Sequence, residues 1–191
     1  AKPLINDALP RPAHAVELMR TRPVPRIFRA PFGAGYYDTS EYMLGSVAVA
    51  IFLPESDGSI DGNQETWTAA ELDTATAGIE AAMEFWASNA PGGVLSFQYE
   101  VHRAIPTPYE PINHGMFDEA VWNSYLANLG YTNADVWVNI YDYLNDLRDR
   151  LGTDWAFAIT CALDDHDSDY SYPDWFAAAW LGGPSIAVTY H

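Results

Sequence analysis

The segment Met43–Leu53 limits the possible folds more than any other part of the chain. After Ser46 it is apolar at every position, reading Val-Ala-Val-Ala-Ile-Phe-Leu. A strand with one face in water alternates apolar and polar residues, whereas a continuous apolar run is typical of a strand buried on both faces. Such a strand needs a covering layer on each side. The segment therefore predicts a sheet that lies between helices.

Three helices and four further strands are predicted around this strand, which is taken as Tyr42–Leu53. The clearest helix is Thr68–Asn89, because Thr68 and Glu71 have the spacing of a capping box and Pro91 follows its end. Its predicted apolar face consists of Leu72, Ala75, Ile79, Ala82, Met83 and Trp86. The other predicted helices are Asp118–Leu129 and Asn133–Leu151, and the other strands are Val94–Ile105, Trp155–Leu163, Phe176–Leu181 and Pro184–Tyr190.

The order of these elements indicates the fold class. The first strand, helix and strand favour a parallel pair joined by a right-handed crossover. The last two strands are separated only by Gly182-Gly183-Pro184, which suggests antiparallel neighbours. We therefore expect an α/β domain over residues 36–191, with a mixed, mostly parallel sheet packed against about three helices.

Charge is distributed unevenly along the chain. The first 29 residues hold six basic and two acidic side chains, giving +4, whereas the net charge of the whole chain is -17. Five prolines in the same stretch disfavour regular structure, so residues 1–35 are predicted to be an extended basic arm. The arm could fold back on its own body, lie on a neighbouring subunit or stay disordered. Its predicted contact residues are Arg20, Arg22, Arg26, Ile27, Phe28 and Arg29.

The acidic body excludes some partners and suggests others. Nucleic acid is disfavoured because phosphate binding needs clustered basic side chains. No apolar run approaches the roughly 20 residues of a membrane-spanning helix. One loop is strongly acidic and could bind calcium, contact the arm or simply remain solvated. The calcium ligands considered there are Asp164, Asp165, Asp167 and Asp169.

Several phrases of the sequence resemble one protein family. They are Ser40–Val49, Leu53-Pro54-Glu55-Ser56, Glu65-Thr66-Trp67-Thr68 and Trp180-Leu181-Gly182-Gly183-Pro184. Together with the element order, they resemble the N-terminal, upper subdomain of secreted bacterial metzincin-like zinc metallopeptidases. The resemblance covers about residues 36–190 and implies a secreted, extracellular protein. It also implies that an edge strand with Phe176, Ala178 and Trp180 holds extended substrate by strand addition; the alternative is an ordinary short edge strand.

The zinc motif of that family has no counterpart in these residues. The family places His-Glu-x-x-His on a helix after this last strand, so that two imidazoles on one helix face meet one zinc ion. No two histidines here have that spacing, and none is followed by Glu. We therefore name no catalytic residue, and zinc is expected only if the natural chain continues past His191 into a further half.

Two functions remain open at this point. The chain is either a secreted metallopeptidase-like domain that is inactive by itself, with a missing C-terminal half as its partner, or an extracellular structural subunit. In the second case the chain assembles with copies of itself through its basic arm. The mass of the native protein separates the two hypotheses.

Overall fold

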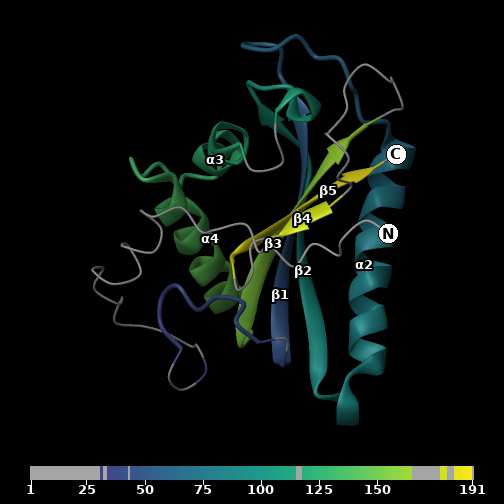
Figure 1. Ribbon diagram of the computed structural model, residues 1–191, viewed down its shortest axis with the longest axis vertical. Coiled ribbons are helices and arrows are strands. Elements are labelled where there is room, and N and C mark those ends of the chain that lie inside the picture. Colours follow the sequence, from purple (N-terminus) through teal and green to yellow (C-terminus); the bar gives the residue numbers. More distant parts are fainter. Residues whose placement is uncertain are drawn as a thin grey trace, which may run out of the picture.

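The computed structural model describes residues 31, 34–42, 44–114, 118–164, 177–179 and 183–190. These residues form a sheet with helices on both faces (Figure 1). The strands are β1 (Gly45–Ser56), β2 (Leu95–Thr107), β3 (Trp155–Leu163), β4 (Ala177–Ala179) and β5 (Ser185–Tyr190). The α-helices are α2 (Ala69–Asn89), α3 (Glu119–Asn128) and α4 (Val136–Leu151).

The strand order in the sheet is β2-β1-β3-β5-β4. The first four of these strands are mutually parallel, and β4 is antiparallel to β5. The predicted α/β class and mixed, mostly parallel sheet are therefore confirmed. Strand β1 continues to Ser56, past its predicted end at Leu53, because a register shift between Phe52 and Pro54 accommodates the proline. Proline lacks an amide donor and is tolerated in a sheet at such irregularities.

Helix α2 covers one face of the sheet. The predicted capping box is present: the Thr68 side chain accepts from the Glu71 amide, and the Glu71 side chain accepts from the Thr68 amide. Only Ala75 and Met83 of this helix are buried. Two members of the predicted apolar face, Ala82 and Trp86, are exposed, and 54% of the Trp86 surface is accessible.

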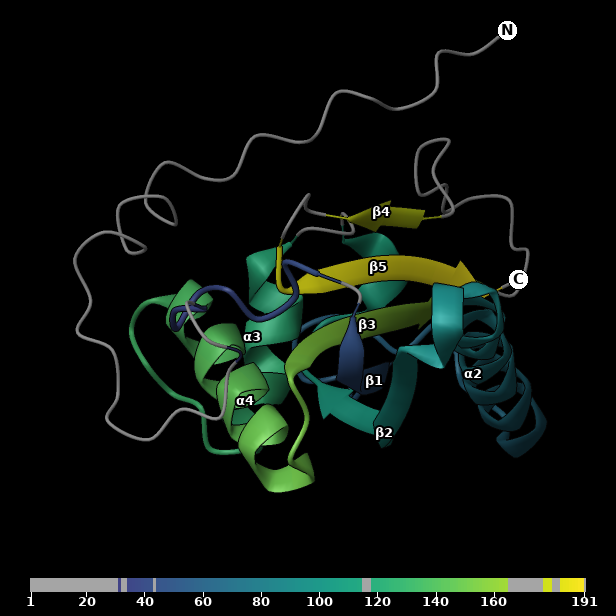
Figure 2. The same cartoon turned by 90° about the horizontal axis from the view of Figure 1, so that it is seen from below.

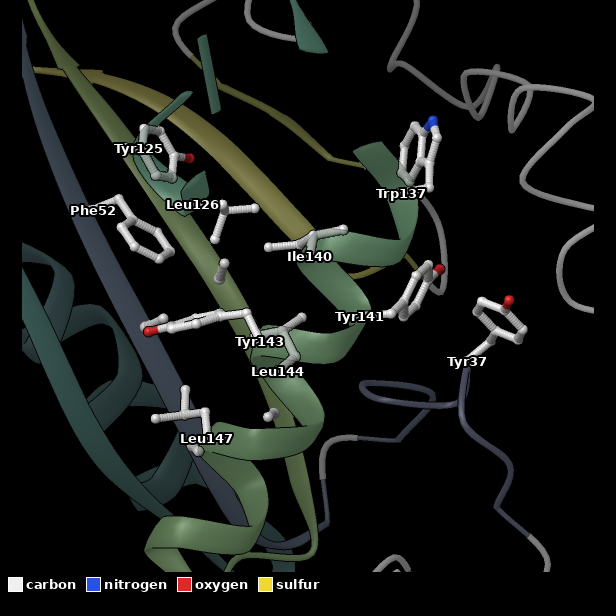
Figure 3. Packing of buried hydrophobic residues seen from close by; sticks show 14 of the residues in the cluster. Tyr37, Phe52, Tyr125, Leu126, Trp137, Ile140, Tyr141, Tyr143, Leu144 and Leu147 are labelled. Atoms are coloured by element: carbon white, nitrogen blue, oxygen red, sulfur yellow. The ribbon is translucent and has the colours of Figure 1, made fainter. Parts of the chain in front are cut away.

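Helices α3 and α4 cover the opposite face (Figures 1 and 2). Helix α4 begins at the cap Asp135, whose side chain accepts from the Trp137 amide, and ends at Gly152 in the left-handed conformation. Its inner side packs on Phe52 of β1 and on the alanines of β1 and β3 (Figure 3). The buried residues of α4 are Trp137, Val138, Asn139, Ile140, Tyr141, Tyr143, Leu144, Asn145, Leu147 and Arg148.

Candidate functional site

Strand β4 forms one edge of the sheet, and among the described strands only β5 pairs with it (Figure 2). The Ala158 amide in β3 donates to the Pro184 carbonyl at 2.9 Å. Backbone groups alternate between the two sides of a strand, so even-numbered residues of β5 face β3 and odd-numbered ones face β4. Ala187 therefore faces β4, where Ala178 is its partner. The two residues that flank Ala178 in β4 consequently turn their N–H and C=O groups to the open edge.

This edge coincides with the predicted peptide-holding strand. The strand is Ala177–Ala179, whereas Phe176, Trp180 and the side chain of Ala178 lie outside the described residues. The described part offers main-chain donors and acceptors at Ala177 and Ala179 and only methyl side chains. Such an edge can bind an extended segment through its backbone, and the described side chains add little selectivity of their own.

The turn into β5 is anchored to the segment that precedes β1. The Ser40 hydroxyl donates to the Gly183 carbonyl at 2.6 Å. Further along, the Asp164 amide donates to the Tyr190 carbonyl at 2.8 Å. Strand β5 is thus held at both ends, and it provides a firm support for the short β4.

The predicted calcium ligands are described only in part. Asp164 directly follows β3 and is buried, with 8% of its surface exposed. Asp165, Asp167 and Asp169 lie outside the described residues, as do all six predicted arm contacts. Within the described ranges, no group of three or more His, Cys, Asp or Glu side chains could hold a metal ion.

A histidine bridge joins two loops beyond the carboxyl ends of β1 and β2. His114 Nε2 lies 2.6 Å from Asp61 Oδ2, and His114 Nδ1 lies 2.7 Å from Asp118 Oδ2. Partial burial lowers the pKa of His114, but the two carboxylates outweigh this and leave the pKa above its ordinary value of 6.5. The His114 hydrogen bond also lowers the pKa of Asp61. Because both ring nitrogens are engaged with carboxylates, this imidazole holds the two loops together and does not serve as a free acid or base.

Glu110 belongs to the same region and is almost fully buried, at 1% exposure. Its Oε2 accepts from the Gln64 amide at 2.8 Å, and its own amide donates to Asp61 Oδ2 at 3.1 Å. Burial raises the pKa of Glu110, although the amide donors oppose the shift. These bonds fasten the loop after β1 onto the segment after β2.

A second polar network lies between β2 and α4. Glu100 Oε1 accepts from the Tyr143 hydroxyl at 2.9 Å and from Arg150 Nη2 at 3.0 Å, and it lies 3.1 Å from His102 Nε2. The Arg150 hydrogen bonds hold the pKa of Glu100 at about 2. Burial lowers the pKa of His102, with Glu100 opposing the shift. The polar atoms point at one another, so the network ties β2 to α4.

Sequence reasoning missed both the His114 bridge and the Glu100 network, although the Glu100 network leaves a signal in the sequence. Glu100 and His102 are two residues apart and so share one face of a strand. Tyr143 and Arg150 are seven residues apart and so share one side of a helix. His114 and Asp118 have similar helix-like spacing, but Asp61 is 53 residues from His114 and gives no local signal.

Comparison with protein-family models, curated proteins and solved structures finds no match to this chain. Among the helices that the structure describes, none is long and apolar enough to cross a membrane.

Proposed function

We propose that this chain is a secreted, metallopeptidase-like α/β domain that holds an extended peptide along β4 and does not cleave peptides with its own residues. The observation that carries this proposal is the open edge at Ala177 and Ala179, in a sheet whose other strands are parallel. The phrases Ser40–Val49 and Trp180–Pro184, which resemble metzincin-type peptidases, support the same function.

The physical basis of the binding is strand addition. A peptide laid against β4 completes the hydrogen bonds that the outward N–H and C=O groups offer, and pockets or charges then select its side chains. The net charge of -17 favours a basic peptide. Cleavage would need a zinc-activated water from a further segment, because His-Glu-x-x-His is absent from these 191 residues.

The test is binding of a fluorescein-labelled decapeptide that alternates valine and lysine, measured by anisotropy with the full chain. Ala179→Pro removes an outward amide and leaves the β5-facing amide of Ala178 in place. We expect it to weaken binding about fivefold, the effect of one hydrogen bond of about 1 kcal/mol. Ala179→Val retains the amide and is the matched control.

Two results would reject this function. One is no binding of the decapeptide at any concentration that leaves the protein soluble. The other is equal binding by Ala179→Pro and Ala179→Val when both variants melt at the wild-type temperature. Chelator-sensitive hydrolysis of the decapeptide by the pure 191-residue chain would contradict the non-cleaving part alone.

The second candidate function is a self-assembling extracellular subunit, which the uneven charge favours. The basic stretch over residues 1–29 and the acidic remainder attract each other, so an arm could join neighbouring copies. Light scattering before and after deletion of residues 1–32 tests this. An unchanged mass and melting temperature would show that the arm neither assembles nor stabilises the protein.

A further inference from the structure

Strand β2 forms the other edge of the sheet, opposite β4 (Figure 2). It is 13 residues long, whereas β4 has three. Among the described strands only β1 pairs with β2, so one side of this long strand has no strand partner. An open edge of this length is a template for pairing with another chain.

The hydrogen bonds of β1 show which residues of β2 face outward. The Gly45 amide donates to the Val94 carbonyl at 2.7 Å, and on the other side of β1 the Ser46 carbonyl accepts from Asp154. Even-numbered residues at the start of β2 therefore face β1. Before the register shift, the backbone groups of the odd-numbered residues face the open edge, and these residues are Leu95, Phe97, Tyr99 and Val101.

Two of the common protections of an edge strand, proline and lysine, are missing from the first two thirds of β2. Residues 96–103 contain no proline, glycine or lysine. The irregular part comes only afterwards, where Ala104 has a φ of 45°, the register with β1 shifts, and Pro106 follows. Edge strands usually carry such features along their length, and these features hinder pairing with another chain. Phe97, Tyr99 and Val101, by contrast, have high strand propensity.

The charges on this edge are balanced, in contrast to the acidic body. Glu100 is paired with Arg150, and Arg103 Nη2 lies 2.6 Å from Asp73 Oδ1. The strand therefore carries no excess negative charge of its own, whereas Glu80 and Glu84 of α2 act on Tyr99 and add negative charge beside the edge. The pairing partner that fits a balanced edge best is an edge with the same balanced sequence.

We propose that β2 pairs antiparallel with β2 of a second copy, with Val101 opposite Val101 at the two-fold axis. This register joins the two five-stranded sheets into one continuous sheet. It places Glu100 opposite His102 of the second copy, and Tyr99 opposite Arg103 of the second copy. The first pair allows a hydrogen bond between imidazole and carboxylate, and the second allows a cation–π contact.

Registers with the two-fold axis at Glu100 or at Tyr99 fit less well. Side chains that lie directly opposite each other must be on the same face of the sheet. The two-fold axis therefore passes through a residue, and each register is named by that central residue. An axis at Glu100 would place two carboxylates opposite each other, which is destabilising. An axis at Tyr99 would place Glu100 opposite Gln98 and Arg103 opposite Leu95, without the imidazole–carboxylate and cation–π contacts.

The salt dependence of this dimer differs from that of an arm-mediated assembly. Each copy carries -17, so the bodies repel each other at long range and added salt should strengthen β2 pairing. An assembly held by the basic arm on an acidic body would instead weaken with salt. The proposal does not rest on peptide binding at β4, which is at the opposite edge.

The first test is sedimentation equilibrium of the full chain over about 50–500 mM NaCl, a range that shortens the screening length severalfold. We expect a monomer–dimer equilibrium that shifts toward dimer as salt rises. Val101→Pro removes the two central cross-copy amides without removing an amide that faces β1. It should weaken dimerisation about tenfold or more. Val101→Thr, which keeps the amide, is the control.

The second test fixes the register and does not depend on proline. The Cα atoms of a directly opposite, hydrogen-bonded antiparallel pair are about 5.5 Å apart, within the range that a disulfide spans. Under mild oxidation Val101→Cys should form a covalent dimer, whereas Tyr99→Cys should not, because its two copies lie about four residues apart along the strands. The native Cys161 is buried.

Each contrary result overturns the proposal. A monomer at every protein and salt concentration excludes the dimer. A dimer that weakens as salt is added excludes this interface. Equal dimerisation by wild type, Val101→Pro and Val101→Thr excludes it as well. Equal cross-linking of Val101→Cys and Tyr99→Cys excludes the register.

Discussion

Helix α4 buries ten of its 16 residues, whereas helix α2 buries two of its 21. Both helices lie on the same sheet, α4 on one face and α2 on the other (Figure 1). On the α4 side the sheet contributes mainly alanines and Phe52, so large helix side chains fill the space (Figure 3). On the α2 side the large side chains of the core come from the sheet, and they include Val49, Ile51, Phe157 and Ile159.

The difference teaches where each helix obtains its stability. Apolar side chains of α4 lose most of their contact with water, and that burial is the dominant favourable contribution to folding. The stability of helix α2 depends more on its own capping box and on partial contact with a sheet face that already carries large side chains. Substitutions in the two helices should therefore have very different effects on the free energy of unfolding.

The largest expected effect is that of Leu144→Ala in α4. Leu144 is fully buried, and its removal leaves a cavity against β1 and β3. We expect a loss of about 3–4 kcal/mol in the free energy of unfolding, measured by urea denaturation. Ile79→Ala at a half-buried site of α2 is the matched substitution and should cost about 1 kcal/mol. Equal losses would contradict the comparison.

Glu100→Gln removes the charge from the network that ties β2 to α4. The folded-state pKa of Glu100, about 2, lies below its ordinary value of 4.5. Its contribution to stability is therefore fully present above pH 4.5 and is lost as the pH falls through about 2. At neutral pH we expect a loss of roughly 1–2 kcal/mol, allowing for partial exposure. Thermal melts from pH 7 to 2 should show a shallower acid dependence in Glu100→Gln than in wild type.

Thr68→Ala tests the dependence of α2 on its cap. The Thr68 hydroxyl accepts from the Glu71 amide at 3.3 Å, as one of the two hydrogen bonds of the capping box. We expect a loss of about 1 kcal/mol in the free energy of unfolding. Thr74→Ala, at an exposed site inside the same helix, is the control and should be nearly neutral. If Thr74→Ala lowers the free energy of unfolding as much as Thr68→Ala does, capping is not the cause of the loss.

The smallest effect is expected at the exposed end of α2. Phe85 and Trp86 are 62% and 54% exposed and contact each other edge-to-face. Trp86→Ser should change the free energy of unfolding by less than about 0.5 kcal/mol. Trp137→Ala in α4, where the indole is buried, should cost about 3 kcal/mol. A loss above 1.5 kcal/mol for Trp86→Ser would show that this end of α2 is not exposed in solution.

The same contrast explains which predictions from sequence succeed. The run Val47–Leu53 is apolar because both of its faces are covered, and it correctly predicts the layered fold. Trp86 lies on the predicted apolar face of α2 and is nevertheless exposed, because periodicity records the spacing of apolar residues and not their depth. After Met83 no residue of α2 is buried, and Phe85 and Trp86 are both exposed.

The polar networks show the limit of sequence reasoning for sites. Asp61 and His114 meet because the loops that follow β1 and β2 lie at the same end of a parallel sheet, a property of the tertiary fold. The outward direction of Ala177 and Ala179 likewise follows from hydrogen bonds between strands. A pattern along one strand reveals which residues share a face, but not which edge their backbone groups point to.

The central place of β1 also has a consequence for how the chain folds. Val47 pairs with Phe97 and with Trp155, so its two neighbours are 50 and 108 residues further along (97 minus 47 and 155 minus 47). Pairings of such long sequence separation form slowly, because a long loop must close before any contact is gained. During synthesis the apolar β1 would emerge well before β3 exists to pair with it and before α4 exists to cover one of its faces. A newly made chain should therefore depend on chaperones, and its refolding from urea should be slow and prone to aggregation.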